Sequence, residues 1–193
     1  LRDKEGNPLK IVGVILDIDR AKKSEQQLTT RASFDALTEL YNRETIESQI
    51  DNEITLSEAR KSEMAVLFID VDDFKHYNDQ YSHATGDQVL KFVARTIKGT
   101  VNEFGFAGRY GGDEFIACIR NAEINDPTRA AQDIISKLEE GFECDGVHLT
   151  VSVSIGISMI KDDYNTRVEY IIGKADDAMY SVKKNGKSNY AFI

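Results

Sequence analysis

A continuous apolar run, Met64 to Ile69, leads directly into the acidic segment from Asp70 to Asp73. Because both faces of such a run are apolar, it predicts a central strand buried on both sides of a sheet. Ligands of α/β folds commonly bind beside the carboxyl ends of strands, so these acids are candidate ligand residues. One of them could cap the following helix instead. Three acids leave a surplus, which we assign to metal binding.

A second acidic pair follows two glycines, Gly111 and Gly112. The apolar segments 107–110 and 115–119 on either side predict a β-hairpin, in which glycine supplies the positive φ that tight turns need. Asp113 and Glu114 would then lie at the tip of the hairpin or just past it. Taken alone they are better explained by a solvated pair after an ordinary turn. Together with the first acidic cluster, they indicate a site for a divalent cation.

The remaining chain alternates between helical and strand periodicity. The pattern predicts helices over 43–61, 86–101, 126–138 and 168–184, and strands over 148–159 and 189–193. Helices that alternate with paired strands indicate an α/β (α+β) fold with a central, mainly antiparallel sheet flanked by helices.

Composition limits the classes of function. The 193 residues carry a net charge of −9, which argues against a nucleic-acid partner. No apolar run approaches the ~20 residues that span a bilayer, so we expect no direct membrane contact from this segment. Cys118 and Cys144 are too few for a disulfide framework and suggest a reducing compartment. We expect a cytoplasmic location, as a part of a larger sensor protein that could itself be attached to a membrane.

Five segments, in order, resemble the GGDEF family, the diguanylate cyclases that condense two GTP molecules into cyclic di-GMP and pyrophosphate. The resemblance covers residues 31 to 193, and Arg109 to Phe115 matches the family's R-Y-G-G-D-E-F without a change. The other segments are 35–43 (D-x-L-T-G-L-x-N-R), 70–87 (D-x-D-x-F-K-x-x-N-D-x-x-G-H-x-x-G-D), 151–157 (the S-x-G strand) and 175–187 (A-D-x-A-M-Y-x-A-K-x-x-G-R). Four residues depart from these patterns: Glu39 and Ser82 replace glycines, Val182 replaces alanine, and Lys187 replaces arginine.

The resemblance implies a ferredoxin-like nucleotidyl-cyclase fold over residues 34–193. Residues 1–20 resemble the last hairpin of a PAS-type sensor domain whose remainder would lie upstream. Residues 21–33 read as a polar linker helix, or equally as a flexible linker, because their apolar seam is too short to form a coiled coil alone.

The resemblance and the charge argument lead to one assignment of the metal site. We expect two Mg²⁺ or Mn²⁺ ions per site, since hard oxygen ligands select such metals and two ions suit phosphoryl transfer. Asp70, the backbone carbonyl of Val71, and Asp113 are the expected ligands, with Glu114 in support. Asp113 or Glu114 is also the candidate general base for the 3′-hydroxyl.

Seven residues are expected to bind the substrate. Lys75, Lys183 and Lys187 would contact the triphosphate, although each could also be a solvated surface charge. A carboxylate accepts from guanine N1–H and N2–H₂, and the resemblance assigns this role to Asp87, with Asn78 beside it. Asp87 could equally be a helix N-terminal acid. The resemblance also places Phe74 and His83 near the nucleotide, although His83 is better explained as a packed or hydrogen-bonded structural residue than as a ligand.

Further expectations concern regulation and assembly. The family's R-x-x-D product-inhibition site would fall on residues 102–105, which read Asn-Glu-Phe-Gly, so we expect no feedback inhibition there. One such site holds one GTP, and a cyclic product therefore needs a homodimer, arranged by the upstream sensor. Two alternatives stay open: a catalytically silent GTP-binding regulatory domain, and a purely structural dimerisation module.

Overall fold

The structure is a computed structural model that describes residues 4–6, 33–161 and 166–193. The chain divides into two compact units, Leu1–Ala32 and Ser33–Ile193. In the first unit only residues 4–6 are described, and they form a turn. The sensor hairpin predicted over 1–20 and the linker helix predicted over 21–33 therefore lie almost wholly outside the described residues. The second unit is the mixed α/β domain described below.

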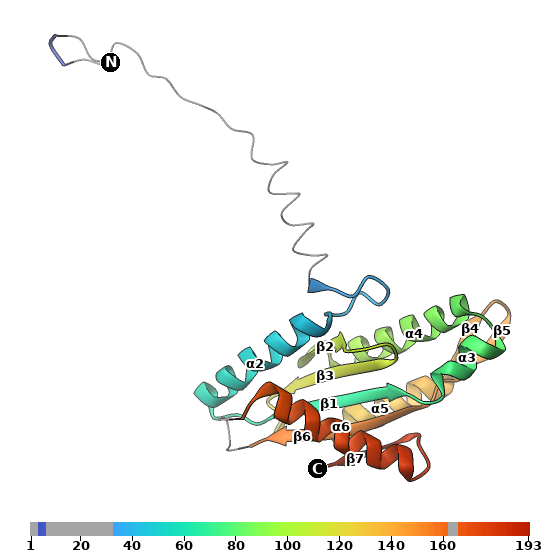
Figure 1. Cartoon of the computed structure of the whole chain (residues 1–193). Helices are drawn as coiled ribbons and strands as arrows, with labels where there is room; N and C mark the ends of the chain where they lie inside the picture. The colour runs from blue at the N-terminus through green and yellow to red at the C-terminus, as the bar shows by residue number, and fades with distance from the viewer. Residues whose placement is uncertain (1–3, 7–32, 162–165) are drawn as a thin grey trace. The chain divides into compact units, whose positions relative to one another are not determined.

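A five-stranded sheet forms the centre of this domain, with the strand order β2-β3-β1-β6-β7 (Figure 1). Only the β6–β7 pair is parallel, and the other three pairs are antiparallel, as the sequence predicts. The strands are β1 Met64–Val71, β2 Gly105–Arg109, β3 Glu114–Arg120, β6 Val153–Ile160 and β7 Asn189–Phe192. A separate two-stranded hairpin consists of β4 Phe142–Cys144 and β5 Val147–Leu149.

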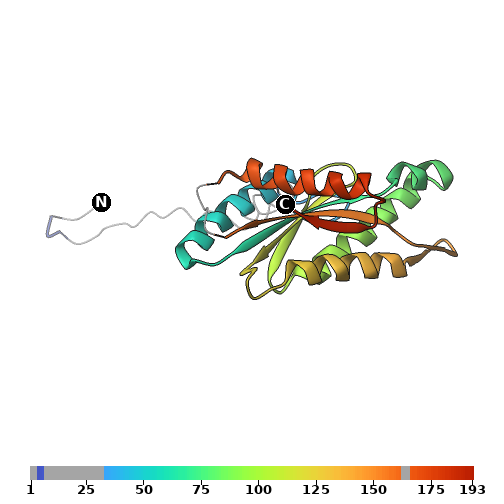
Figure 2. The same cartoon turned by 90° about the horizontal axis from the view of Figure 1, so that it is seen from below.

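Helices cover both faces of the sheet (Figure 2). The apolar side chains of α2 and α6 pack on one face, and those of α4 and α5 pack on the other. The short helix α3 follows β1 directly and contacts α4. The helices are α2 Arg43–Arg60, α3 Phe74–Gln80, α4 His83–Val101, α5 Pro127–Glu140 and α6 Val168–Lys184. No helix in the described part of the chain is long and apolar enough to span a membrane.

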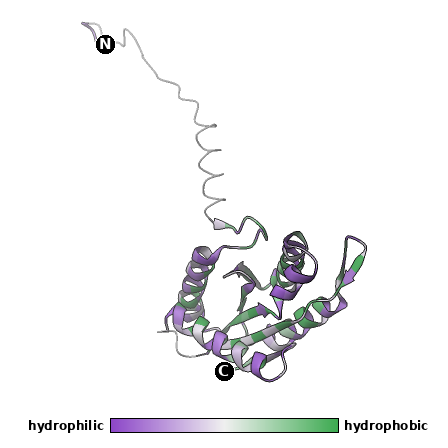
Figure 3. Ribbon diagram, turned by 45° about the vertical axis from the view of Figure 1, so that its right-hand side comes forward, coloured by the Kyte–Doolittle hydropathy of each residue, from purple (hydrophilic) through white to green (hydrophobic). Residues whose placement is uncertain are grey.

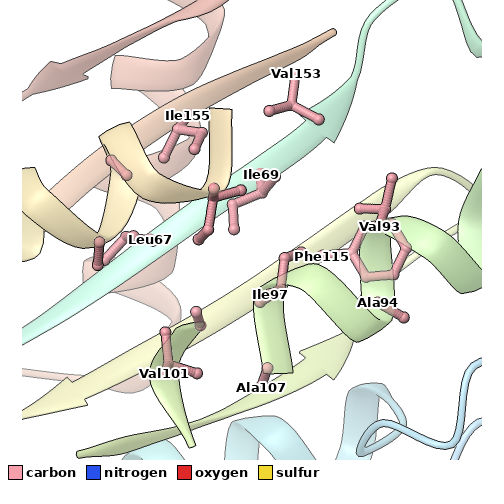
Figure 4. Close-up of a cluster of buried hydrophobic side chains, with 14 of the residues drawn as sticks. Leu67, Ile69, Val93, Ala94, Ile97, Val101, Ala107, Phe115, Val153 and Ile155 are labelled. Carbon is pink, nitrogen blue, oxygen red and sulfur yellow. The ribbon is translucent and has the colours of Figure 1, made fainter. Parts of the chain in front are cut away.

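Strand β1 is buried along its whole length, as its apolar sequence predicts. Its side chains alternate between two cores, because successive residues of a strand point to opposite faces. Leu67 and Ile69 pack with α4 and α5 (Figure 4), whereas Val66 and Phe68 pack with α2 and α6. Hydrophobic residues accordingly line the inner faces of the helices, and polar residues line their outer faces (Figure 3). By this alternation Asp70 belongs to the face of the sheet that α6 covers.

Several predicted boundaries need correction. Helix α4 begins at His83 and not at Gly86, because Ser82 caps it: the Ser82 hydroxyl accepts a hydrogen bond from the Thr85 N–H at 3.1 Å. The strand predicted over 148–159 is two strands, β5 and β6, and β5 pairs with β4 instead of joining the main sheet.

The prediction that glycine supplies a positive φ in the β2–β3 turn was wrong. Neither Gly111 nor Gly112 adopts the left-handed conformation. The loop between β2 and β3 comprises four residues, 110–113. Loops of this length are most often built around a type I turn, whose residues have negative φ. A Cβ at Gly111 would collide with the Glu114 carboxylate and displace it, whereas Gly112 faces open space.

Candidate active site

Asp70 and Glu114 lie directly opposite each other on neighbouring strands. Asp70 is the penultimate residue of β1, Glu114 is the first residue of β3, and the two are paired in the antiparallel register. Paired residues share one face of the sheet, so both carboxylates lie on the side covered by α6. Like charges in this arrangement repel each other. The fold therefore concentrates negative charge at this end of the sheet.

The pKa values of these carboxylates are raised mainly by burial and further by the neighbouring negative charges. Burial raises the pKa of Asp70 to about 6; the nearby Lys183 ammonium offsets part of the rise, and the charges of Asp113 and Glu114 add to it. Burial also raises the pKa of Glu114, with further contributions from Asp113 and Asp176. Lys183, near the end of α6, forms an ion pair with Asp70 in which Nζ and Oδ1 are 2.6 Å apart. One lysine thus faces several carboxylates.

Asp113 lies in the turn just before β3, half-buried, and its carbonyl accepts a hydrogen bond from the Val71 N–H at 3.2 Å. This bond joins the turn to the last residue of β1. Arg109 holds the same turn from the other side: its Nε and Nη2 donate to the Gly112 carbonyl at 3.1 and 2.7 Å. The backbone around Asp113 is thereby fixed relative to Asp70.

The Arg109 guanidinium also reaches the beginning of the domain. Its Nη1 donates to both carboxylate oxygens of Asp35, at 3.2 and 3.3 Å. Burial acts against ionisation of Asp35, but hydrogen bonds from Thr38 and the charge of Arg109 bring its pKa below the usual value. Sequence reasoning did not assign Asp35 or Arg109 to the site, although both lie in the quoted family motifs. The signal available was an arginine two residues before the glycine pair.

Asp72 and Asp73, the two acids that follow β1, have partners within the protein. The expectation that the surplus of acids in this segment serves metal binding was therefore too broad. Asp72 is buried and accepts hydrogen bonds from the hydroxyls of Ser152 and Ser154, the latter at 2.7 Å, and from the Ser188 N–H at 3.2 Å. Asp73 forms an ion pair with Lys187. Of the three acids, only Asp70 lies with Asp113 and Glu114.

The donor set suits a hard divalent cation. Asp70, Glu114, Asp113 and the Val71 carbonyl offer only oxygen atoms. Burial is the main reason that the pKa values of Asp70 and Glu114 are raised, and the neighbouring carboxylates add to the rise. Among the described residues, no three Asp, Glu, His or Cys side chains are gathered closely enough to hold an ion by themselves. Mg²⁺ usually binds through one or two carboxylates together with waters and substrate phosphates. The residues present fit such an ion.

The candidate base-binding residues lie in the α3–α4 hairpin. Asn78 on α3 packs against Gly86 on α4 so closely that a Cβ at Gly86 would collide with the Asn78 side-chain oxygen. Asp87 is the next residue and is exposed. Because α4 begins at His83, Asp87 lies beyond the first turn, where the helix dipole has little effect. The alternative reading of Asp87 as a helix N-terminal acid therefore loses its basis.

The remaining predicted substrate residues lie in α3, at the start of α4 and near the end of α6. Phe74 and Lys75 are the first two residues of α3; Phe74 is half-buried beside Gly86, and Lys75 is exposed. His83 is the exposed first residue of α4, which does not support a packed structural role. Lys187 follows α6. The structure thus places predicted phosphate-binding residues on α3, α6 and the turn after α6.

The two glycine replacements have different consequences. Ser82 has an extended backbone, with φ at −172°, and serves as the N-cap of α4, so serine fits this position well. Glu39 has a φ of 59°, in the left-handed region that glycine adopts without strain. The departure at Glu39 therefore carries a conformational cost, and the departure at Ser82 does not.

Comparison with known proteins identifies the family. The model of the diguanylate cyclase GGDEF domain matches residues 32–189. The chain therefore belongs to the GGDEF family, and the resemblance read from its motifs is confirmed.

Individual relatives agree with this assignment. Diguanylate cyclase A of Treponema denticola is 38% identical over 136 residues, which are 70% of this chain and 36% of that protein. The GGDEF domain of TpbB from Pseudomonas aeruginosa has a TM-score of 0.77 at 32% identity, over 82% of this chain and 93% of that one. The coiled coil and GGDEF domain of DgcB from Caulobacter crescentus, solved with c-di-GMP, has a TM-score of 0.84 at 24% identity, over 91% and 93% of the two chains, and shows the shared fold. The chain spans 22% to 36% of the first four curated relatives it matches.

Proposed function

We propose that this domain is a diguanylate cyclase that condenses two GTP molecules into cyclic di-GMP and two pyrophosphates. The observation that carries the proposal is the pair of opposed carboxylates, Asp70 and Glu114, beside Asp113 at one end of the sheet. It supports the proposal because phosphodiester formation at an α-phosphate needs bound cations, and this is where the fold concentrates oxygen ligands.

The chemical step forms one bond and breaks another. The 3′-oxygen of one GTP attacks the α-phosphorus of a second GTP, the bond to the bridging oxygen breaks, and pyrophosphate leaves. The same step in the opposite direction, from the 3′-oxygen of the second nucleotide to the α-phosphorus of the first, closes the ring and releases the second pyrophosphate. We assign the hydroxyl proton to Asp113 or Glu114. Two Mg²⁺ or Mn²⁺ ions, held by Asp70, the Val71 carbonyl and Asp113 with Glu114 in support, would neutralise charge on the reacting oxygens. Lys75, Lys183 and Lys187 would hold the triphosphate.

Guanine selection is assigned to Asn78 and Asp87, with Phe74 and His83 beside the nucleotide. A carboxylate at Asp87 matches the donor pair N1–H and N2–H₂ of guanine, and adenine has no such pair. The Asn78 side-chain oxygen lies against Gly86, the residue that precedes Asp87 in α4. This contact supports the assignment of both residues to one base-binding site.

The active unit is proposed to be a homodimer, because each protomer would bind one GTP and the cyclic product requires two. In the longer protein, we propose that residues 1–20 end a PAS-type sensor and that residues 21–33 link it to the cyclase in the cytoplasm. The bonds from Arg109 to Asp35 and to Gly112 support communication with the linker, since they join the start of the domain to the turn that carries Asp113.

Product analysis tests the proposal. The chain is incubated at high concentration with GTP and Mg²⁺, and the nucleotides are separated chromatographically, with Asp113→Ala in parallel. Cyclic di-GMP from the parent and none from the variant is the expected result. Intact GTP that is nevertheless bound would support the silent regulatory alternative, and absence of GTP binding would support the structural one.

A further inference from the structure

The lysine that follows α6 is held by an acid that the family pattern does not assign to the site. Lys187 Nζ donates to both carboxylate oxygens of Asp73, at 2.7 and 2.8 Å. The charge of each residue acts on the other: this bond lowers the pKa of Asp73 and raises the pKa of Lys187. Lys187 is one of the lysines to which we assign the triphosphate, so in this structure a carboxylate takes the place of phosphate oxygens.

The backbone directs the Asp73 side chain toward Lys187 and away from its own helix. Asp73 stands at the N-cap position of α3, where an aspartate normally bonds to the N–H groups of the first turn. Its φ is 53°, in the left-handed region, and its side chain makes no capping hydrogen bond. Substitution of Asp73 would therefore not remove a cap. Asparagine would also tolerate the left-handed conformation.

Lys187 is positioned independently of this ion pair. Its N–H donates to the Val182 carbonyl at 3.1 Å, and its own φ is 65°. The next residue, Ser188, donates through its N–H to Asp72 and through its hydroxyl to Glu139 at 2.6 Å. The turn would thus stay beside the β1–α3 segment without Asp73.

The Asp73 carboxylate is accessible to a competing ligand. Its side chain is 68% exposed, and the residue lines a shallow surface hollow together with Lys75, His76 and Asp79. Exposed ion pairs are weak, so phosphate oxygens can replace the carboxylate on Lys187. Lys183 is held in the same way by Asp70. Both candidate phosphate lysines at the end of α6 therefore have acidic partners on the β1–α3 segment.

We propose that Asp73 sets the affinity of this domain for the triphosphate of GTP by competing for Lys187. This inference rests on the proposed function, because it takes GTP as the ligand. Binding of GTP exchanges the carboxylate for phosphate oxygens on the Lys187 ammonium, and the cost of the exchange weakens binding. Removing the charge of Asp73 frees the lysine and tightens binding.

Calorimetric binding of guanosine 5′-(α,β-methylene)triphosphate with Mg²⁺, which cannot release pyrophosphate, tests this on the full chain. The variants are Asp73→Asn, Lys187→Met and their combination. Asp79→Asn is the matched control, since Asp79 is exposed and lines the same hollow. We expect Asp73→Asn to bind about two- to fivefold more tightly than wild type, in keeping with a weak exposed pair. Asp79→Asn should change binding by less than about twofold.

The combined variant separates competition from general repulsion. If Asp73 acts through Lys187, then in the Lys187→Met background Asp73→Asn should tighten binding of the analogue no more than Asp79→Asn does in the wild type. The proposal is overturned if Asp73→Asn raises the affinity equally with Lys187 and with methionine at that position, or if it raises the affinity no more than Asp79→Asn does. Either result leaves the cyclase assignment intact. A wild-type chain that does not bind the analogue refutes both.

Discussion

Replacing Asp70 by asparagine should stabilise the metal-free domain at neutral pH. Burial and two neighbouring acids raise the pKa of Asp70 from 3.8 to about 6. One pKa unit corresponds to about 1.4 kcal/mol, so keeping this carboxylate ionised in the folded state costs about 3 kcal/mol. Only 6% of the residue is exposed, so solvent screening reduces this cost little. Asparagine has a similar shape and carries no charge.

The pH dependence identifies the cause. The folded state binds the Asp70 proton more tightly than the unfolded state does, so this group reduces stability as the pH rises from about 4 to about 6. The difference in unfolding free energy between Asp70→Asn and wild type should be near zero at pH 4. It should grow to about 3 kcal/mol by pH 7 and remain constant above that.

Urea unfolding in the presence of a chelator, from pH 4 to 8, measures this difference. Asp51→Asn is the control for net charge, since Asp51 is an exposed residue of α2. We expect the control to change stability by less than about 0.5 kcal/mol at every pH. A variant at Asp70 that is less stable than wild type at pH 7, or equally stabilised at pH 4 and 7, would refute the reasoning that buried charge is concentrated there.

Three further predictions concern single residues. Glu39→Gly should raise the unfolding free energy by about 1 kcal/mol, because it removes left-handed strain; unchanged or lower stability in urea unfolding would disprove this. Gly156→Ala should lower the unfolding free energy by about 3 kcal/mol, since its Cβ would collide with the α6 backbone. The control Gly99→Ala, which has open space around the new Cβ, should not destabilise the domain. Equal shifts of the thermal unfolding midpoint for the two variants would contradict the packing argument. Asp87→Asn should raise the KM for GTP about tenfold and reduce the preference for GTP over inosine triphosphate, which lacks the N2 amine; steady-state kinetics with an unchanged preference would remove Asp87 from base recognition.

The sequence predicts the elements whose pattern is set by burial. The apolar face of α6 repeats regularly from Val168 onward, and the prediction of 168–184 matches its bounds. Strand β1 was recognised because both of its faces are apolar. By contrast, β5 and β6 were predicted as one strand, because alternation continues across residues 150–152 and does not reveal which partner each strand joins.

The sequence also indicates which acids could bind metal, but not how they are arranged. It does not show that Asp72 accepts hydrogen bonds from the hydroxyls of Ser152, just before β6, and Ser154, within it, since these contacts join residues about 80 positions apart. Nor does it show that Lys183 and Lys187 have acidic partners, because ion pairs depend on the packing of α6 beside β1. Nor does the glycine pair reveal the conformations of Gly111 and Gly112, because glycine adopts negative and positive φ about equally readily.

The measurement that tests the cyclase assignment most directly is the yield of cyclic di-GMP and pyrophosphate per GTP consumed, over a range of chain concentrations. We expect one cyclic di-GMP and two pyrophosphates from two GTP. The rate per protomer should rise with concentration as two protomers meet. GTP that binds but stays intact at every concentration would contradict the assignment.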